Sequence, residues 1–490
     1  MLHFFLMSAQ FTKKEITKKS ENISDWYTDV ILKAEIADYA PVKGTMVIRP
    51  YGYAIWERVQ AVLDPMLKKM GIQNAYFPLF IPHSLLEKEK EHVKGFSPEL
   101  AIVTIAGGEK LKDPLVVRPT SEAIMYEMYA KWIQSWRDLP VLINQWNNAV
   151  RWEKRTYLFL RTSEFLWQEG HTAHEDEKGA IDMDLMALEW YRKVYEEYYA
   201  IPVMLGTKSD AEKFAGAKAT YTVEALMPDG KALQGATSHN LGQNFSKPFK
   251  IQFQNREGKN DFVWQTSWGF STRSLGGLFL VHGDDDGLII PPKIAPIKVV
   301  IIPILGKDDE KILAAAQDIK KEIEKVSSEF TGSVQVWDQE QKTFGWKANE
   351  AELKGIPIAV VIGPKELAEE KVSVSRRLGK EKQTVPLKGL GEEVEKILQG
   401  LQSDLFEKAK KFREENTHEV SSYDEFKKIM ETTRGFIWAF WCEGEDCEKK
   451  IKEETKATTR LLPLDAKNED GKCVYCGSAA KHRWLFAQAY

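Results

Sequence analysis

The chain has 490 residues, of which 43% are hydrophobic and 29% are charged, a composition typical of folded proteins that divide into several domains. Its formal net charge of −4 excludes a globally basic protein of the histone type, although a local basic surface could still bind nucleic acid. No apolar run is long enough for a membrane span, and the amino-terminal segment reverses the order of charged and apolar residues found in signal peptides, so we predict a cytoplasmic protein.

The pattern of residues predicts a short tail followed by three domains. Residues 1–20 are interpreted as the tail, and residues 21–292 as a large domain rich in tryptophan and strand-like runs, with helices expected at 53–70, 121–136 and 181–199. The segment "IIPPKIAP" (289–296) is interpreted as a linker, because its prolines disfavour a helix and favour an extended connection.

Strands and helices alternate after the linker. "IKVVIIPI", "SVQVWD" and "IPIAVVIG" have the character of strands, and "DDEKILAAAQDIKKEIEKV" and "WKANEAELKG" that of helices. This alternation predicts a small α/β domain with parallel strands at 297–400. A lysine-rich helix at 402–416 then leads into a third unit, 402–490, which holds all the cysteines.

Charged residues and aromatic residues crowd the segment "AVRWEKRTYLFLRTSEFLWQEGHTAHE" in the large domain. Arg151 and Glu153 alternate with other residues as on one face of a strand, and a hairpin turn at 154–157 would return a second strand with Arg161 and Glu164–Glu169. Such an array suits a ligand that carries both signs of charge. The alternatives are a solvated hairpin of salt bridges or, through His171 and His174, a metal site.

The four cysteines lie near the carboxyl terminus with C-x4-C and C-x2-C spacing. Two pairs of thiolates can close a tetrahedral site around Zn²⁺, and a site without an open position would be structural. The sequence therefore predicts zinc at Cys442, Cys447, Cys473 and Cys476. Thiols that are merely apolar or redox-active are the alternative.

Five segments in order along the chain resemble the class II aminoacyl-tRNA synthetases, and in detail the prolyl-tRNA synthetases of the archaeal and eukaryotic type. "GIQNAYFPLFIP" resembles motif 1, "RWE" with "RTSEFLWQEGHTAHE" motif 2, and "WQTSWGFSTRSLGG" motif 3. "VVRPTSE" and "GATSHNLGQNF" resemble segments of the amino-acid pocket. The ordered set is far more specific than any one of its members.

The resemblance implies an architecture and a reaction. The expected fold is an α+β catalytic domain, with the class II antiparallel sheet and flanking helices, followed by an α/β anticodon-binding domain and a small α+β zinc-binding domain. The expected enzyme is a ligase of protein biosynthesis that activates L-proline with ATP and Mg²⁺ to prolyl-adenylate and transfers the prolyl group to tRNA(Pro). Motif 1 implies a homodimer.

Residue roles follow from the matched positions. Arg151 and Arg273 would be catalytic, because the attack of a carboxylate on a phosphate requires positive charge and alignment. The proline site would comprise Thr120, Glu122, Arg151, Trp167, Glu169, His171 and His239. The ATP site would comprise Arg151, Glu153, Arg161, Thr162, Phe165, Gln234, Thr237 and Arg273, with Gln234 associated with magnesium.

Further roles concern the tRNA and the carboxyl terminus. The segment 338–357 matches the part of the family that binds the anticodon, with Lys342, Trp346 and Lys347 as candidate contacts and Arg376 and Arg377 as backbone contacts. A solvated basic loop is the alternative. The subtype carries a zinc-bearing domain that ends in tyrosine, as this chain does at Tyr490.

Two other functions were weighed against the enzyme. A non-enzymatic paralogue would keep the fold without activating an amino acid, yet Thr120, Glu122, Arg151 and Arg273 are all present. A zinc-dependent nucleic-acid module would explain the cysteines but leaves the first 290 or so residues unused. The sequence therefore favours the enzyme.

Overall fold

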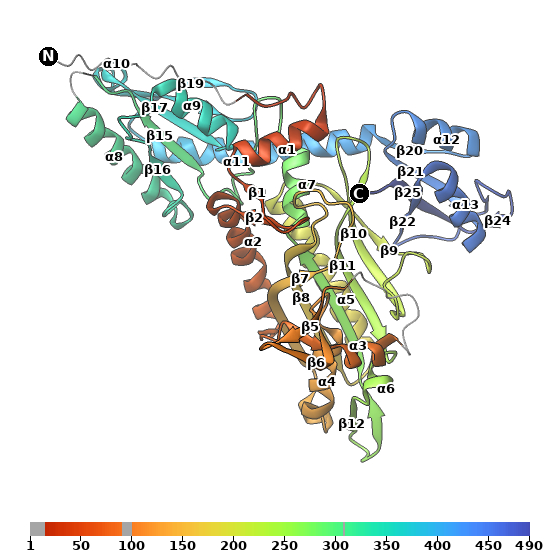
Figure 1. Ribbon diagram of the computed structural model, residues 1–490. Coiled ribbons are helices and arrows are strands. Elements are labelled where there is room, and N and C mark those ends of the chain that lie inside the picture. The colour runs from red at the N-terminus through yellow and green to blue at the C-terminus, as the bar shows by residue number, and fades with distance from the viewer. Residues whose placement is uncertain (1–14, 91–99, 307–308) are drawn as a thin grey trace.

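The computed structural model describes residues 15–90, 100–306 and 309–490, so most of the predicted amino-terminal tail lies outside the described residues. The described chain forms three units. The first domain occupies the centre and lower part of Figure 1, the second lies at the upper left, and the third, coloured blue, lies at the right.

An antiparallel sheet organises the first domain. Its strands follow the order β9-β10-β11-β14-β8-β7, and a short β3 pairs with β7 in parallel. The bounds are β3 Gln73–Asn74, β7 Val141–Val150, β8 Glu164–His174, β9 Val203–Thr207, β10 Ala219–Leu226, β11 Ala232–Gly242 and β14 Trp264–Ser271. This sheet agrees with the class II fold expected from the sequence.

Helices and small sheets surround this central sheet. The helices are α1 Ile23–Lys33, α2 Pro50–Lys69, α3 His83–Lys90, α4 Glu122–Trp132, α5 Glu177–Lys193, α6 Ser246–Phe249 and α7 Arg273–His282, with short turns at Trp136–Asp138 and Val194–Tyr198. The small sheets pair β1 Ala37–Tyr39 with β2 Met46–Ile48, β12 Gln252–Gln254 with β13 Asn260–Phe262, and β6 Glu109–Val117 with β4 Phe80–Pro82 and β5 Ile102–Ala106. The three predicted helices correspond to α2, α4 and α5 with its π-helical end.

Aromatic residues fill the core between α5 and the central sheet. The rings of Trp190 and Trp268 meet edge to face at 5.7 Å, and Tyr191 stacks on Phe270 with 5.5 Å between ring centroids. Gln168 of β8 also faces α5, because its Oε1 accepts a hydrogen bond of 2.8 Å from the Tyr191 hydroxyl. Since successive residues of a strand point to opposite faces, the residues of β8 next to Gln168 face away from α5.

The second domain contains a mixed sheet of order β16-β15-β17-β18-β19. Its elements are β15 Val299–Pro303, α8 Asp309–Val326, a turn at Ser328–Phe330, β16 Val334–Val336, α9 Phe344–Leu353, β17 Ile358–Ile362, α10 Pro364–Ala368, β18 Lys371–Arg376 and β19 Lys382–Pro386. Strand β15 pairs in parallel with β16 and β17, as predicted. Strands β18 and β19 then add an antiparallel hairpin at the edge of the sheet. The short connection 377–381 is sufficient for antiparallel strands only.

A continuous helix crosses the predicted boundary between the second and third units. Helix α11 spans Leu390–Glu415, whereas the sequence placed the boundary near residue 401. Leu401 and Leu405 lie on its buried side, against Ile289 of the linker and Ala200. The apolar stripe therefore continues through the expected junction, and one rigid helix connects the two units.

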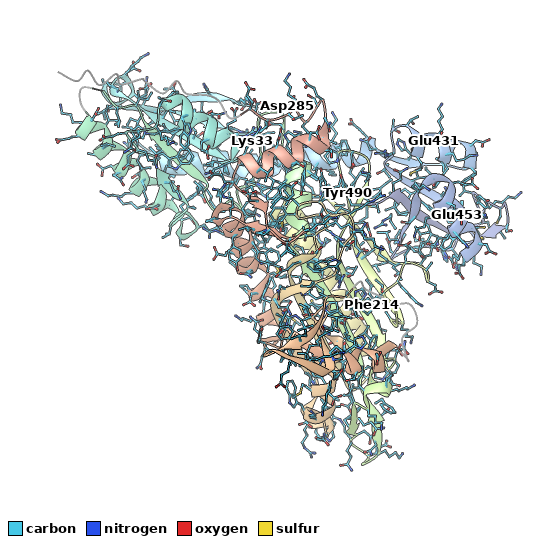
Figure 2. All side chains as sticks on the ribbon, in the orientation of Figure 1. Lys33, Phe214, Asp285, Glu431, Glu453 and Tyr490 are labelled. Atoms are coloured by element: carbon cyan, nitrogen blue, oxygen red, sulfur yellow. The ribbon has the colours of Figure 1, made fainter. Side chains whose placement is uncertain are left out.

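The third domain extends the central sheet. Its elements are β20 Thr417–Glu419, α12 Tyr423–Glu431, β21 Phe436–Trp441, α13 Glu445–Thr455, β22 Ala457–Pro463, β23 Gly471–Lys472, β24 Ala479–Ala480 and β25 His482–Gln488. Strand β22 pairs with β9, so one sheet of 11 strands runs through both domains. Figure 2 shows Tyr490 near the middle of the molecule, where its backbone N–H donates to the carbonyl of Ala232 in the first domain.

Candidate active site

A cavity of about 340 Å³ opens on the face of the central sheet that lies away from α5. Every residue predicted from the sequence for the proline and ATP sites lines it, although these residues come from segments that lie far apart in the chain. They are Thr120, Glu122, Arg151, Glu153, Arg161, Thr162, Phe165, Trp167, Glu169, His171, Gln234, Thr237, His239 and Arg273. Arg151 and Arg273 therefore share one cavity.

Alternation along the strands explains this convergence. Phe165, Trp167, Glu169 and His171 occupy every second position of β8 and point to the cavity. Residue Gly269 of β14 stands opposite Glu169 and leaves room, because a Cβ there would come within 3.3 Å of the Trp167 ring. The small side chain thus opens the floor of the cavity beside Trp167.

The connection between β7 and β8 differs from the predicted hairpin. Strand β7 ends at Val150, so Arg151 and Glu153 lie in an irregular loop rather than on a strand. The loop tip, residues 158–160, is buried: the Tyr27 hydroxyl donates to the carbonyl of Leu158, and the ring of Phe159 packs against Phe279. The apolar sequence "LFL" anchors the loop in the core, which a solvated turn would not do.

The two central arginines are held by backbone carbonyls. Arg151 Nε donates to the carbonyl of Pro119 at 3.1 Å, and Arg273 Nε donates to the carbonyl of Leu160 at 2.9 Å. No ion pair of either guanidinium is found within the described part of the chain. Burial lowers the pKa of both arginines, and their mutual repulsion adds to this effect at Arg273. A guanidinium nevertheless stays charged at any physiological pH, so within the described residues the cavity presents two cations without a direct ion pair, although Glu122, Glu169 and Glu153 attract Arg151 from a greater distance.

Arg161 differs from these two arginines. Its Nε lies 2.8 Å from Glu153 Oε2, and its side chain is 54% exposed at the mouth of the cavity. The Phe165 ring lies beside Arg151, with 5.4 Å between the guanidinium carbon and the ring centroid. Thr162, next to Arg161, also lines the cavity, and its hydroxyl donates to the carbonyl of Glu164.

A buried ion pair forms the other end of the cavity. Glu169 accepts hydrogen bonds from Asn147 Nδ2 at 2.6 Å and Gln145 Nε2 at 3.1 Å, and its Oε2 lies 3.0 Å from His171 Nε2. Burial would raise the pKa of Glu169 and lower that of His171, but their mutual contact outweighs burial in both. The pKa of Glu169 therefore lies below, and that of His171 above, its ordinary value, which favours a charged pair.

The first residue of α4, Glu122, brings another carboxylate to the cavity. Thr120 donates through its hydroxyl to Glu122, and both side chains are buried. Ser121 occupies the N-cap position of this helix, but its hydroxyl donates to Glu169 and caps no backbone N–H. The hydroxyl is used to hold the buried carboxylate, which links the loop to β8.

His239 forms part of the wall as a neutral ring. It hydrogen-bonds the hydroxyls of Thr220 and Thr237, each at 3.0 Å, and its ring packs on Phe214 with centroids 4.6 Å apart and the planes tilted by 31°. Burial lowers the pKa of His239 to about 3, helped by the charges of His171 and Arg151. His174 is buried and hydrogen-bonded to the Thr172 hydroxyl, and it is not among the residues that line the cavity.

Sequence reasoning missed part of the wall. Lys208, Glu212 and Phe214 lie in the irregular segment between β9 and β10, and Ser267 and Ser271 lie on β14. The serines could have been found from their period of two with Gly269 in motif 3. The segment after β9 carries no pattern that points inward, since its lysines and glutamates resemble a solvated loop.

Two of the predicted tRNA contacts need correction. Lys347 is 2% exposed and Arg377 is 5% exposed, so neither side chain is displayed to a large partner. Arg377 binds the carboxylate of Asp284 with both terminal nitrogens and joins the second domain to the first. Lys342 is exposed, with its ammonium 4.3 Å from the centroid of the Trp346 ring, and Arg376 is half-buried beside Asp404.

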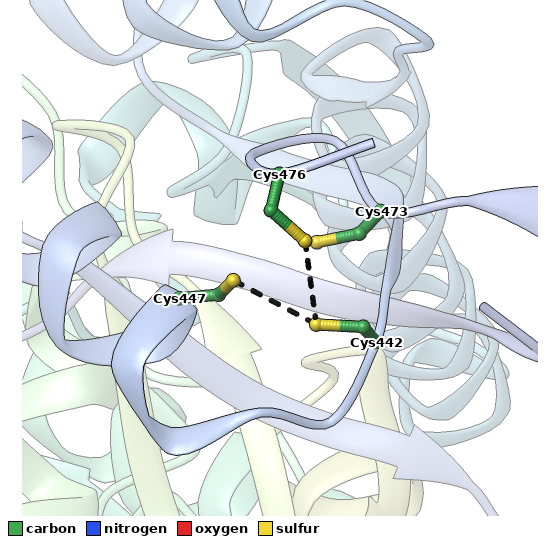
Figure 3. A group of neighbouring side chains, drawn as sticks. All are labelled: Cys442, Cys447, Cys473 and Cys476. Carbon is green, nitrogen blue, oxygen red and sulfur yellow. Dashed lines mark hydrogen bonds between the residues drawn. The ribbon is translucent and has the colours of Figure 1, made fainter. Parts of the chain in front are cut away.

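The four cysteines converge in the third domain (Figure 3). Cys442 follows β21, Cys447 lies on α13, and Cys473 and Cys476 lie in the turn after β23. Their sulfur atoms all lie within 4.8 Å of one another, and Cys442 Sγ is 3.7 Å from Cys447 Sγ and 3.8 Å from Cys476 Sγ. A tetrahedron of thiolates at 2.3 Å from Zn²⁺ places sulfurs roughly 3.8 Å apart, so the cluster fits this ion.

None of the helices in the described residues is long and apolar enough to cross a membrane.

Three family profiles match the chain. "tRNA synthetase class II core domain (G, H, P, S and T)" matches residues 104–280, "Anticodon binding domain" matches 298–397, and "Prolyl-tRNA synthetase, C-terminal" matches 423–490. Whole-chain relatives include "Proline--tRNA ligase" of Natranaerobius thermophilus, 52% identical over 97% of this chain and 98% of the relative. "Proline--tRNA ligase 2" of Clostridioides difficile is 50% identical over 97% of this chain and 98% of the relative. "Proline--tRNA ligase" of Chloroherpeton thalassium is 50% identical over 97% of this chain and 100% of the relative.

Proposed function

Because the chain belongs to the proline--tRNA ligase family, we propose that it activates L-proline with ATP and transfers the prolyl group to tRNA(Pro). One observation carries the proposal: Arg151 and Arg273 line the same cavity as Glu122 and the Glu169–His171 pair. The cavity thus offers cations for a carboxylate and phosphates at one end and carboxylates for an ammonium at the other.

In the first step a carboxylate oxygen of proline attacks the α-phosphorus of ATP, and the bond to pyrophosphate breaks. Both reactants are anionic, so the reaction requires positive charge fixed in place before they meet. Arg151 would bridge the proline carboxylate and the α-phosphate, and Arg273 would bind the nucleotide from the opposite side. Their carbonyl contacts hold both guanidinium groups without neutralising them.

The nucleotide would lie toward the mouth of the cavity. Phe165 offers one face for adenine and the Arg273 guanidinium the other, while Glu153 would accept from the adenine amino group. Arg161 and Thr162 would contact phosphates, as would Gln234 and Thr237. The Arg161–Glu153 contact supports this placement, because it keeps both side chains at the mouth before ATP binds.

Proline would occupy the end of the cavity near Thr120, Glu122 and His239. The ammonium group requires acceptors, which Thr120 and Glu122 provide, and the ring requires apolar walls, which Trp167 and His239 provide. Glu169 is already bonded to four side chains of the protein, so we assign it to holding His171 and the loop of Ser121 rather than to direct contact.

In the second step a hydroxyl of the terminal ribose of the tRNA attacks the prolyl carbonyl carbon, and AMP leaves. The second domain would bind the anticodon, with Lys342 and the half-buried Trp346 as a stacking surface. Arg376 lines a second cavity of about 520 Å³ in that domain, where it would contact the sugar–phosphate backbone of the tRNA.

We further propose the partners that the resemblance implied. Mg²⁺ would neutralise the phosphates of ATP, with Gln234 nearby, and Zn²⁺ held by the four cysteines would stabilise the third domain.

A homodimer is supported by the apolar side chains of the motif 1 segment, of which Tyr76 is 72% and Phe80 47% exposed. Sedimentation equilibrium that shows only monomer would exclude the homodimer. The four cysteines form no disulfide, which favours the reducing cytoplasm, and cell fractionation checks this location.

ATP–pyrophosphate exchange with each of the twenty amino acids tests the function. We expect exchange with proline, and weak exchange at most with alanine or cysteine, because a small apolar ring offers only about 1–3 kcal/mol of discrimination. Transfer is then measured with tRNA(Pro) transcripts. Exchange with none of the twenty would favour a non-enzymatic paralogue, and preference for another amino acid would overturn the specificity.

A further inference from the structure

The segment 208–214, between β9 and β10, forms one wall of the cavity without being part of a helix or strand. Three of its side chains, Lys208, Glu212 and Phe214, line the cavity. The Phe214 ring lies against His239, which places this part of the segment beside the proposed proline site. An irregular segment keeps such a position only if other parts of the protein hold it.

Helix α13 of the third domain holds this segment at two points. Ser209 Oγ donates to Glu448 Oε1 at 2.7 Å, and Lys452 Nζ lies 3.0 Å from Glu212 Oε1. Ser209 and Glu448 are 3% and 5% exposed, so their bond is shielded from water. The Lys452–Glu212 pair is exposed on its lysine side, where the side chain is 58% accessible. Figure 2 labels Phe214 in the first domain and Glu453 of α13 in the third.

A buried network adds a third point. Glu224 of β10 is wholly buried and binds Arg460 of β22, with Nε at 3.1 Å and Nη2 at 2.9 Å, and Lys208 Nζ at 3.1 Å. Burial would raise the pKa of Glu224, but Arg460 and Lys208 outweigh it and hold the pKa below its ordinary value. One carboxylate of the first domain therefore joins a cavity lysine to an arginine of the third domain.

We propose that Glu448, Lys452 and Arg460 are positioning residues for the amino-acid site: the third domain holds the segment 208–214 in place and thereby sets the affinity for proline. The inference rests on the proposed function. The two α13 contacts hold the segment whose Phe214 ring packs on His239 of the proline site, so losing them weakens binding of proline more than binding of ATP. A domain required only for stability would change both substrates alike or neither.

The test compares variants at the two α13 contacts in the full-length protein. Ser209→Ala, Lys452→Ala and their combination remove the contacts, and Lys450→Ala is the matched control, because Lys450 is an exposed lysine of the same helix that pairs with Glu453 instead. KM for proline and for ATP are measured separately in ATP–pyrophosphate exchange. Wild-type exchange with proline first establishes the function itself.

We expect KM for proline to rise about twofold in Lys452→Ala, because this variant loses a partly exposed ion pair. In the double variant KM for proline should rise at least about fivefold, because a buried hydrogen bond to a carboxylate is lost as well. KM for ATP and kcat stay within about twofold, and Lys450→Ala behaves as wild type. Equal rises in both KM values, or an unchanged KM for proline in Lys452→Ala and the double variant, would overturn the proposal. Lys452→Ala removes an exposed side chain and should fold as the wild type does. Its KM values therefore test the proposal even if the Ser209 variants do not fold.

Discussion

At the scale of single residues, the cavity separates charges that are neutralised from charges that are not. Arg161 has Glu153, and His171 has Glu169, whereas Arg151 and Arg273 are tied to backbone carbonyls. A carbonyl fixes the position of a guanidinium but removes none of its charge. The two arginines are therefore available to anionic ligands, and this arrangement supports the catalytic role that we propose for them.

Replacing Arg151 tests that assignment. Arg151→Ala should lower the rate of ATP–pyrophosphate exchange at least about 10³-fold, because preorganised positive charge is lost where two anions meet. The fold should persist, since one carbonyl contact is lost. Exchange measured beside Arg155→Ala, an exposed arginine of the same loop, provides the comparison. Near-normal exchange in a folded Arg151→Ala protein would remove this residue from the mechanism.

A second residue-scale prediction concerns pH. His282 is buried, its Nε2 lies 2.6 Å from the carbonyl of Tyr199, and burial lowers its pKa to about 3. A lowered pKa means that the unfolded chain binds a proton below pH ~6.5 while the folded protein does not. The contribution of His282 to the free energy of unfolding is therefore fully present above pH ~6.5. It falls by about 1.4 kcal/mol per pH unit as the pH drops toward ~3.

Chemical denaturation followed from pH 7 to pH 5 measures this decline. In His282→Gln the loss of stability over that range should be smaller than in the wild type, because one titrating group is gone, whatever the variant does to stability at pH 7. Parallel curves for the two proteins would contradict the buried neutral state of His282.

At the scale of elements, β8 shows what alternation determines. Odd-numbered residues from Phe165 to His171 face the cavity, and the even-numbered Gln168 and Gly170 face α5. A strand at Glu164–Glu169, which implies such alternation, was expected from the sequence. The end of β7 at Val150 was not, because the loop that follows is fixed by the burial of residues 158–160 against distant α1 and α7.

Two glycines provide an element-scale prediction. A Cβ on Gly170 would stand 2.1 Å from the ring of Trp268, so Gly170→Ala should lower the free energy of unfolding by about 3 kcal/mol. Gly400 lies exposed within α11 with nothing within 4 Å, so Gly400→Ala should raise it by about 0.5–1 kcal/mol. Urea denaturation compares both with the wild type, and a harmless Gly170→Ala would show that the Trp268 ring does not pack on β8 as described.

At the scale of the whole molecule, the third domain is joined to the first through the sheet. The pairing of β22 with β9 and the Arg460–Glu224 contact cross between the two, and α11 links the third domain to the second. Disturbing the cysteine cluster should therefore affect more than its own surroundings.

Metal removal tests this connection. We expect about one zinc ion per chain in the purified protein and much less in Cys473→Ser, because a structural zinc site requires all its thiolates. Dialysis against a chelator should lower the melting temperature, and added zinc should restore it. Metal analysis by mass spectrometry and calorimetry measure both. Zinc-free protein with an unchanged melting temperature would exclude the structural role.

The sequence by itself indicated a division into three units and a cysteine cluster, because these depend on local pattern and spacing, and its resemblance to the class II synthetases implied the antiparallel core and the fourteen residues that line the cavity. Only the tertiary structure decided that Lys347 and Arg377 are buried, that Ser121 bonds Glu169, that α11 is continuous, and that the third domain reaches the segment 208–214. These features depend on which distant charges and apolar surfaces meet when the chain folds. Burial and pairing across domains are properties of the packed molecule and leave no periodic signal in the chain.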